Sequence, residues 1–175
     1  MDRLVLSVLG EDIKRDLGLS DSELGFLLGF AFAAFYATIG IPIARVADRR
    51  SRRGVAAISV ALWSLATAAS GLANNLWQLA LARVFVGIGE AGGSPPSHSL
   101  VADYFPPERR AAAYSFLGSG GVVGSMLGFA LGGWIAQNFG WRMTFVFFGV
   151  PGIALAGLLF FTVKEPARGL LDGLV

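Results

Sequence analysis

A single carboxylate, Glu90, stands near the middle of a long apolar stretch that runs from residue 76 to residue 104. If this stretch is helical, Glu90 lies 14 residues into it, or about 21 Å along the axis at 1.5 Å per residue. A charge in apolar surroundings is costly, so the side chain is expected to face a water-filled cavity or a partner. Burial also favours the protonated form of a carboxyl group. Glu90 is therefore predicted to take up and release protons, and the alternative is a permanent structural ion pair.

Arg83 and Gly87 precede Glu90 at helical spacing, so the three residues share one face of a helix. Arg83 is expected to pair with Glu90 or with a carboxylate on the outer side of the membrane. The spacing fits a structural role as well as a role in coupling.

Pro95 and Pro96 interrupt the second half of the same stretch, and they predict a disturbed helix because proline lacks a backbone donor. The freed carbonyl groups, together with the hydroxyls of Ser94 and Ser97, are expected to line a polar cavity. His98 is the single histidine of the chain, and an imidazole can relay protons near neutral pH. A hydrogen-bonded structural role is the favoured interpretation of His98.

The residues do not support other kinds of chemistry. Residues 87–92 fit the G-x-G-x-x-G dinucleotide fingerprint, but that fingerprint requires a preceding strand and a βαβ unit. The sequence has no cysteine, and it shows no nucleophile–base pair, metal-ligand cluster or phosphate-binding loop. It therefore predicts no enzyme activity, no metal site and no cofactor apart from a coupling proton.

The composition indicates a membrane protein. Hydrophobic residues make up 54% of the chain and charged residues 15%, whereas soluble domains carry about 25% charged residues. The net charge of +2 is too small to indicate nucleic-acid binding. Four charge-free stretches are long enough to cross a bilayer core of about 30 Å, at residues 24–43, 54–82, 111–140 and 143–163.

Helices are the expected spanning structures, because open strands would leave backbone groups unpaired in lipid. Strands of a barrel would alternate apolar and polar residues, whereas these stretches are continuously apolar. The fold class predicted is an all-α integral membrane protein, with residues 1–163 as its transmembrane part. The expected helices are a partial first helix at about 1–10, too short to span, and full helices at 24–44, 54–73, 76–104, 111–137 and 143–163. An acidic external loop with a short interfacial helix is expected at 11–23, and the start of a cytoplasmic central loop at 164–175.

The basic residues predict the orientation. Nine lysines and arginines fall in segments that share one side by parity, and three fall on the other side. An excess of basic residues marks the cytoplasmic side. The segments at 45–53, 109–110 and 164–168 are therefore placed in the cytoplasm, and a bacterial chain of this kind is expected in the inner (cytoplasmic) membrane.

A weak internal repeat relates the two parts of the chain. Ala44, Ala47 and Arg53 correspond to Gly133, Ala136 and Arg142 at an offset of 89 residues. The repeat predicts two sets of three helices with inverted topology, which is typical of secondary transporters.

The loop at residues 44–53 resembles the signature of the major facilitator superfamily, Gly-x-Leu-Ala-Asp-Arg-x-Gly-Arg-Arg. Ala44 and Ser51 stand where the signature has glycine, and Val46 stands where it has leucine. Residues 83–89 resemble a second motif of the family. Three further segments resemble the spinster-like branch of the family, at 87–98, 103–110 and 164–169. The resemblance covers nearly the whole chain. It implies an N-terminal six-helix half with an inverted repeat of three plus three helices, an incomplete first helix and a missing C-terminal half.

The resemblance also implies a role for Asp2 and Arg3. They match a pair that lines the central cavity of spinster-like proteins, where the planar guanidinium of Arg3 suits an anionic headgroup. A salt bridge between helices and an exposed chain terminus are the alternatives.

A cytoplasmic latch between the two halves is implied for the signature residues Asp48, Arg49, Arg52 and Arg53, with a solvated loop as the alternative. Asp103 and Glu108 are the expected partners of this latch. A second feature resembles the glycine motif of the fifth helix in the family. It is a stripe with a four-residue period, which predicts close helix packing or a sliding surface, at Gly120, Gly124, Gly128 and Gly132.

Together, these features predict a proton-coupled secondary transporter that moves an amphipathic or lipid-like small molecule by alternating access. The expected partners are the lipid bilayer, this substrate and the missing C-terminal half, and nucleic acid is not among them. The alternatives are a drug or organic-anion exporter of the same superfamily, and a non-transporting membrane scaffold or receptor fragment. The chain is not expected to transport alone, because one wall of the cavity would be missing.

Overall fold

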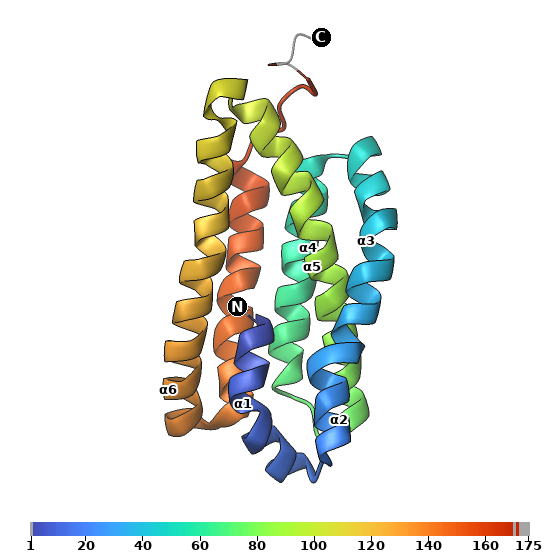
Figure 1. Cartoon of the computed structure of the whole chain (residues 1–175), viewed down its shortest axis with the longest axis vertical. Helices are drawn as coiled ribbons and strands as arrows, with labels where there is room; N and C mark the ends of the chain where they lie inside the picture. Colours follow the sequence, from blue (N-terminus) through green and yellow to red (C-terminus); the bar gives the residue numbers. More distant parts are fainter. Residues whose placement is uncertain (1, 170, 172–175) are drawn as a thin grey trace.

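The chain folds into a bundle of long helices that lie side by side (Figure 1). This computed structural model describes residues 2–169 and residue 171, with side chains from Val5 onward. The side chains of Asp2 and Arg3, two predicted site residues, lie outside the described residues. No strand occurs in the described part of the chain, and the predicted all-α fold class is confirmed.

Short connections join successive helices. Side chains at two helix starts accept hydrogen bonds from backbone N–H groups, as Ser51 does from Gly54 at 3.1 Å and Asn75 from Gln78 at 2.9 Å. The elements are α1 (Asp2–Leu17), α2 (Asp21–Gly25), the π-helical turn η1 (Phe26–Phe30), α3 (Ala31–Arg49), α4 (Arg52–Ser70), α5 (Leu76–Tyr104) and α6 (Pro107–Thr162). The elements α2, η1 and α3 follow one another without a break over 29 residues.

The element α6 consists of two antiparallel rods (Figure 1). The backbone turns at Gly140, whose φ of 80° and ψ of 165° lie in a region that favours glycine. The rods cover residues 107–139 and 141–162 and correspond to the two separate helices expected at 111–137 and 143–163, the second of which ends one residue earlier than expected.

The first helix differs from the sequence prediction. It reaches Leu17, well beyond the expected end near residue 10, so an external loop over 11–23 is wrong for most of that segment. Helix α1 is followed by Gly18, with a φ of 65°, and α2 begins in a capping box formed by Ser20 and Glu23. Only residues 18–20 connect the two helices.

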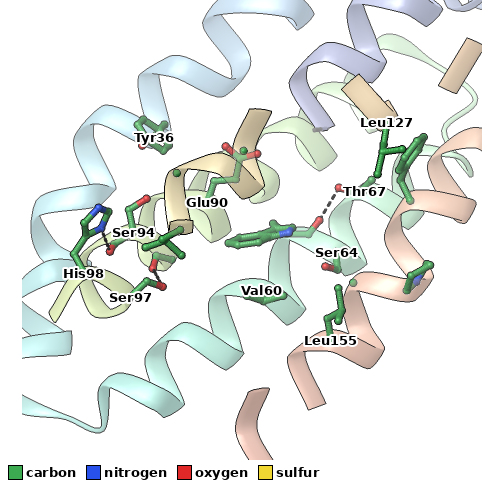
Figure 2. A pocket seen from close by; sticks show the side chains of 18 of the residues that line it. Tyr36, Val60, Ser64, Thr67, Glu90, Ser94, Ser97, His98, Leu127 and Leu155 are labelled. Carbon is green, nitrogen blue, oxygen red and sulfur yellow. Dashed lines mark hydrogen bonds between the residues drawn. The ribbon is translucent and has the colours of Figure 1, made fainter. Parts of the chain in front are cut away.

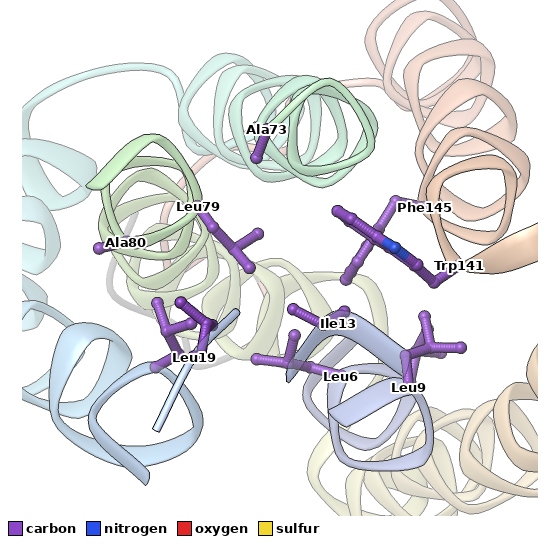
Figure 3. Packing of buried hydrophobic residues seen from close by; sticks show 11 residues of the cluster. Leu6, Leu9, Ile13, Leu19, Ala73, Leu79, Ala80, Trp141 and Phe145 are labelled. Carbon is purple, nitrogen blue, oxygen red and sulfur yellow. The ribbon is translucent and has the colours of Figure 1, made fainter. Parts of the chain in front are cut away.

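The extension of α1 has a packing cause, visible in the main apolar core (Figure 3). Leu9 and Ile13 lie one turn apart on one face of α1, and both are fully buried. They belong to the same cluster as Trp141 and Phe145 of α6, whose rings meet edge to face at 6.0 Å. Burial of this face stabilises α1 although the charged residues between Leu9 and Ile13 are exposed.

Helix α5 is the polar element of the bundle. Three helices of the described chain are long and apolar enough to cross a membrane, at Asp21–Arg49, Arg52–Ser70 and Pro107–Thr162. Helix α5 is also long, with 29 residues, but its many glycine, serine and proline residues and its charges lower its apolarity. A polar helix inside an apolar bundle is expected to line a site rather than face lipid.

Glycines let the helices approach closely at specific crossings. A Cβ atom at Gly149 of α6 would lie 2.5 Å from the backbone nitrogen of Ala68 in α4. A Cβ atom at Gly89 of α5 would lie 2.7 Å from the backbone nitrogen of Trp63 in α4. These distances are shorter than any side chain tolerates, so both crossings require glycine.

The glycine stripe predicted for the fifth helix is only partly a packing surface. Gly128 and Gly132 are buried, and a Cβ atom at Gly132 would sit 3.6 Å from Val5 of α1. Gly120 is exposed and has open space around it, and Gly124 is half-buried. The stripe is therefore buried at Gly128 and Gly132, where α1 lies near the rod, and a sliding surface at Gly120 and Gly124 stays a prediction.

Substitution of Gly149 by alanine is expected to destabilise the bundle by about 1–3 kcal/mol, since the new methyl group would push α6 away from α4. The matched control is Gly118→Ala on the other rod of α6, where a Cβ atom meets nothing within 4 Å. That change is expected to be neutral or to stabilise the helix by up to about 1 kcal/mol. Unfolding free energies measured in mixed detergent micelles compare the two variants. Equal effects would contradict the assigned close crossing.

Candidate functional site

A cavity of about 880 Å³ opens inside the bundle between α3, α4, α5 and α6 (Figure 2). One wall carries carboxylate, hydroxyl and imidazole groups, and another wall is made of leucine and phenylalanine side chains. Its two unlike walls suit a molecule with a polar and an apolar part.

The polar wall belongs mainly to α5. Glu90, Ser94 and His98 line the cavity at steps of four residues, and Ser97 follows Ser94 by three residues, so they form a column along one side of the helix. Figure 2 shows this column beside Tyr36, which reaches the cavity from α3. The sequence predicted that Ser94 and Ser97 line a polar cavity, and the structure places both there.

Pro95 and Pro96 do not break α5, although they were expected to disturb it. The helix runs without interruption from Leu76 to Tyr104. Contacts on both sides hold it: Pro96 is buried, and Gly92 and Gly93 pack against α4. Packing against a neighbouring helix is a known means of tolerating proline within membrane helices.

The ring of His98 is held at the edge of the cavity by two neighbours. Its Nδ1 atom lies 2.8 Å from the carbonyl oxygen of Ser94. The ring stacks on Tyr114 of α6, with centroids 5.4 Å apart, and the Tyr114 hydroxyl donates to the His98 carbonyl at 3.2 Å. These contacts connect the polar column of α5 with the first rod of α6.

The apolar wall is formed largely by both rods of α6. Leu127 and Leu131 come from the first rod, and Phe147, Phe148 and Leu155 from the second. Figure 2 shows Leu127 and Leu155 on the side away from His98. The cavity therefore has hydrogen-bonding groups at one side and a hydrocarbon surface at the other.

The predicted partners Glu90 and Arg83 occupy different surroundings. Glu90 is half-buried and lines the cavity near the middle of α5. Arg83 is 1% exposed, and its guanidinium carbon lies 5.7 Å from the ring centroid of Phe32 in α3. Arg83 is not among the described residues that line the cavity, so the structure separates these two predicted site residues by environment.

The signature loop meets α5 and the C-terminal segment in a buried charge network. Arg52 is 2% exposed, and it forms an ion pair with Asp103, one of the partners expected from the sequence. Its Nε atom also lies 3.0 Å from a carboxylate oxygen of Glu165, and an Nη atom donates to the Pro166 carbonyl at 2.8 Å. The network therefore joins three segments that are far apart in the sequence.

The sequence did not identify Glu165 as a partner of the loop. Its carboxylate accepts hydrogen bonds from the Ser51 hydroxyl at 2.8 Å and from the Arg53 backbone N–H at 2.9 Å. Arg168 strengthens the contact by donating to the carbonyl oxygens of Ala47 and Arg50. The spinster-like resemblance at 164–169 covers this docked segment but does not indicate its contact with the loop.

The remaining latch residues behave differently. Asp48 and Arg49 are exposed, and their side chains make no hydrogen bond or ion pair with the part of the chain described. Glu108, the second expected partner, is also exposed and unpaired within the described residues. The expectation that Glu108 binds the latch is therefore wrong for this structure, because Glu165 takes the position beside Arg52 and Arg53.

Docking of the segment that contains Glu165 onto the signature loop is expected to depend on pH. Burial opposes ionisation of Glu165, but hydrogen bonds from Arg53, Arg52 and Ser51 outweigh it and lower its pKa from 4.5 to about 2. Docking is therefore expected to be strong above pH 4.5 and to be lost as the pH falls towards 2, when Glu165 is protonated.

A fluorophore on a cysteine introduced at Ala167 reports this release, because the chain has no other cysteine. The control is the same labelled chain with Glu165→Gln, whose signal should already be that of the released segment at neutral pH. A release that follows the same pH curve in both proteins would contradict the role of Glu165.

A second arginine–aspartate ion pair lies at the opposite end of the bundle from that of Arg52 with Asp103. Arg142, beside the turn of α6, forms an ion pair with Asp16 of α1 and donates to the Ala73 carbonyl at 3.2 Å. Arg142 corresponds to Arg53 in the predicted repeat. Each ion pair joins an arginine at the start of one helix to an aspartate near the end of another. Each pair also links the first set of three helices in the predicted repeat to the second set.

The chemistry available at the site is binding and proton exchange. No group of three or more histidine, cysteine, aspartate or glutamate side chains in the described chain could hold a metal ion. A carboxylate, hydroxyls and an imidazole beside a hydrocarbon wall can bind an amphipathic molecule and can exchange a proton.

Known proteins give the family context. The family model described as Major Facilitator Superfamily matches residues 1–174. An MFS-type efflux pump of Mycolicibacterium smegmatis is 42% identical over 163 residues, which cover 93% of this chain and 38% of that protein. Protein spinster homolog 1 of Homo sapiens is 30% identical over 175 residues, with 98% of this chain and 33% of that protein covered.

Solved structures agree in fold. The crystal structure of a bacterial homologue of the human lysosomal transporter spinster, in an inward-facing and occupied conformation, matches with a TM-score of 0.93 and 39% identity. The match covers 98% of this chain and 42% of that one. The inward-facing, unoccupied structure matches with a TM-score of 0.82, 38% identity, and coverage of 96% and 40%. This chain thus spans about two fifths of the length of these relatives.

The resemblance seen in the signature loop therefore extends over the whole helical bundle. The matched relatives are membrane transporters, and their fold places the chain in a bilayer as a multi-pass protein rather than among the enzymes. On the family match over residues 1–174, the chain belongs to the Major Facilitator Superfamily.

Proposed function

We propose that this chain is the N-terminal half of a proton-coupled transporter that moves an amphipathic, lipid-like molecule by alternating access. The observation that carries the proposal is the cavity with a polar column on α5 and an apolar wall on α6. A headgroup would bind beside Glu90 and Ser94, and an acyl chain would lie along Leu127 and Phe148. Similarity to spinster proteins supports a lysolipid as the substrate class.

Glu90 is the residue that we assign to proton coupling. It is the only carboxylate among the described residues that line the cavity, and it lies near the middle of a helix of 29 residues. A carboxylate at that depth is stable only when solvated, paired or protonated, so substrate binding beside it changes its affinity for a proton. Asp2 and Arg3 remain part of the proposed substrate site on the resemblance alone.

Alternating access requires a second half, which would pack on this one. Large apolar side chains are exposed on α3 and α6, with exposed fractions of 64% for Ile41, 67% for Met126 and 83% for Phe116. Part of this surface is expected to meet the missing C-terminal half and part to meet lipid. Asp48 and Arg49 are exposed at one end of the bundle and are proposed to latch the two halves together.

The three segments rich in lysine and arginine lie at one end of the bundle, hereafter the basic end (45–53, 109–110 and 164–168). Contacts of Arg52 with Glu165 and of Arg168 with Ala47 join the first and third of these segments. Arg52 also pairs with Asp103 near the end of α5, six residues before the second segment. We assign the basic end to the cytoplasm and, for a bacterial chain, the protein to the inner (cytoplasmic) membrane.

A second function has specific support. The MFS-type efflux pump of Mycolicibacterium smegmatis shares 42% of residues with this chain, and a probable galactarate/D-glucarate transporter of Bacillus subtilis shares 31%. Export of drugs or organic anions is therefore the alternative. The hydrocarbon wall formed by α6 favours an amphipathic substrate over a fully polar sugar acid.

The proposal is tested with proteoliposomes that contain this chain together with the C-terminal half of the bacterial spinster homologue. Uptake of a fluorescent lysophospholipid is expected when a pH gradient is imposed and is expected to vanish when the gradient collapses. The chain alone should give the signal of empty liposomes. Uptake of sugar acids or drugs without lysophospholipid uptake would favour the alternative, and gradient-independent uptake would refute proton coupling.

A further inference from the structure

A second cavity, of about 560 Å³, lies where α5 ends and α6 begins, and we call it the hairpin groove. Its walls are apolar apart from one charged side chain, Arg109, among the described residues. The groove follows the first rod of α6 from Arg109 to Gly120, a rise of about 16 Å at 1.5 Å per residue. The apolar lining consists of Val101, Phe105, Ala112, Ala113, Phe116, Leu117 and Gly120.

Two neighbouring arginines at the mouth of the groove have different roles. Arg110 donates from Nε to the carbonyl oxygens of Ala102 and Phe105 at 3.1 Å, so it fixes the turn between α5 and α6. Arg109 is exposed, and its side chain makes no hydrogen bond or ion pair with the residues that the structure describes. The adjacent Glu108 does not neutralise it. Arg109 is therefore a cation that is available to a ligand.

The position of the groove in the bundle indicates what that ligand is. Arg109 lies at the basic end, where the Tyr104 hydroxyl donates to the Lys164 carbonyl at 2.6 Å. In a membrane-spanning bundle, the ends of the helices lie at the depth of the lipid headgroups, and the apolar residues one to three turns further along lie among the acyl chains. A site with an arginine at headgroup depth and a hydrocarbon floor below it is complementary to a phospholipid with a net negative charge.

We propose that the hairpin groove binds an anionic phospholipid of the surrounding bilayer, with its phosphate on Arg109 and an acyl chain along Phe116 and Gly120. Phe116, which is 83% exposed, would be covered by that chain. This site is separate from the transport cavity, which lies on the other side of Leu117 and contains Glu90. The proposal depends on the membrane location of the bundle and on Phe116 belonging to the lipid-facing part of its surface, and not on the proposed substrate.

Lipid binding to the purified chain is measured by native mass spectrometry after addition of phosphatidylglycerol or phosphatidylcholine. Arg109→Gln is expected to weaken binding of phosphatidylglycerol about fivefold, the size expected for one basic residue at an anionic lipid surface, and to leave phosphatidylcholine unchanged. The matched control is Arg45→Gln, which removes another arginine of the basic end that is exposed and whose side chain has no partner among the described residues. It should leave the binding of both lipids unchanged. Equal losses in the two variants would overturn the proposal, because they would indicate diffuse attraction, as would no loss in Arg109→Gln.

A second measurement identifies the occupant of the groove in membranes. A photo-crosslinking amino acid at Phe116 is expected to label phospholipid, and Gly120→Leu, which fills the floor of the groove, should abolish that labelling. Gly120 has open space around it, so the change does not threaten the packing of the bundle. Cross-links to a second copy of the chain or to a C-terminal half, in place of lipid, would overturn the assignment.

Discussion

Replacement of Glu90 by glutamine is expected to reduce pH-gradient-driven uptake to the level of empty liposomes. The amide keeps the size and hydrogen-bonding capacity of the side chain but cannot release a proton at any physiological pH. Because Glu90 is the only carboxylate in the described cavity lining, no neighbour there can take over the proton. Exchange of substrate across the membrane without a gradient should persist, because the rest of the cavity is unchanged.

The matched control for this experiment is Glu108→Gln, which makes the same chemical change at an exposed carboxylate of the basic end. It should transport at the rate of the unmodified protein. Uptake that still follows the pH gradient in Glu90→Gln would remove Glu90 from the mechanism. Loss of both gradient-driven uptake and exchange would indicate that Glu90 holds the substrate rather than a proton.

The largest effect on stability is expected from Asp103→Asn. This change leaves the guanidinium of Arg52, which is 2% exposed, without its closest countercharge. Breaking a buried ion pair on one side costs about 3–5 kcal/mol. The free energy of unfolding in mixed micelles, followed by tryptophan fluorescence, should fall by that amount. Glu165 retains its contact with Arg52, so the loss is expected near the lower end of the range.

Two further variants separate the buried pair from a general effect of charge. Asp48→Asn removes an exposed carboxylate of the same loop that has no partner among the described residues, and it should change stability by less than about 0.5 kcal/mol. The double variant Arg52→Met with Asp103→Leu removes both charges and should recover most of the lost stability. A double variant that is no more stable than Asp103→Asn would contradict the account, because the cost would then not arise from an isolated buried charge.

The sequence predicted the fold class because long charge-free stretches indicate membrane-spanning helices. It failed where packing rather than composition decides the structure. Residues 11–17 look like a polar loop. However, Leu9 and Ile13 pack α1 against Trp141, which lies more than 120 positions away in the sequence. A periodic stripe such as Gly120 to Gly132 likewise does not reveal which of its glycines meets another helix.

The candidate site was predictable to the extent that it lies on one helix. Glu90, Ser94 and His98 are neighbours on α5, so helical spacing alone places them in one column. The apolar wall and the docked segment at Glu165 depend on contacts between distant residues, which a single sequence does not specify. The ion pair of Asp16 with Arg142 was missed for the same reason.

The most direct test of the account is the number of protons exchanged when substrate binds. The chain, assembled with a C-terminal half, is titrated with lysophospholipid in weakly buffered solution while a pH indicator records proton uptake or release. A proton change upon binding is predicted for the unmodified protein and none for Glu90→Gln, although both bind the lipid. An identical proton change in the two proteins would contradict the claim that this carboxylate links the cavity to the proton gradient.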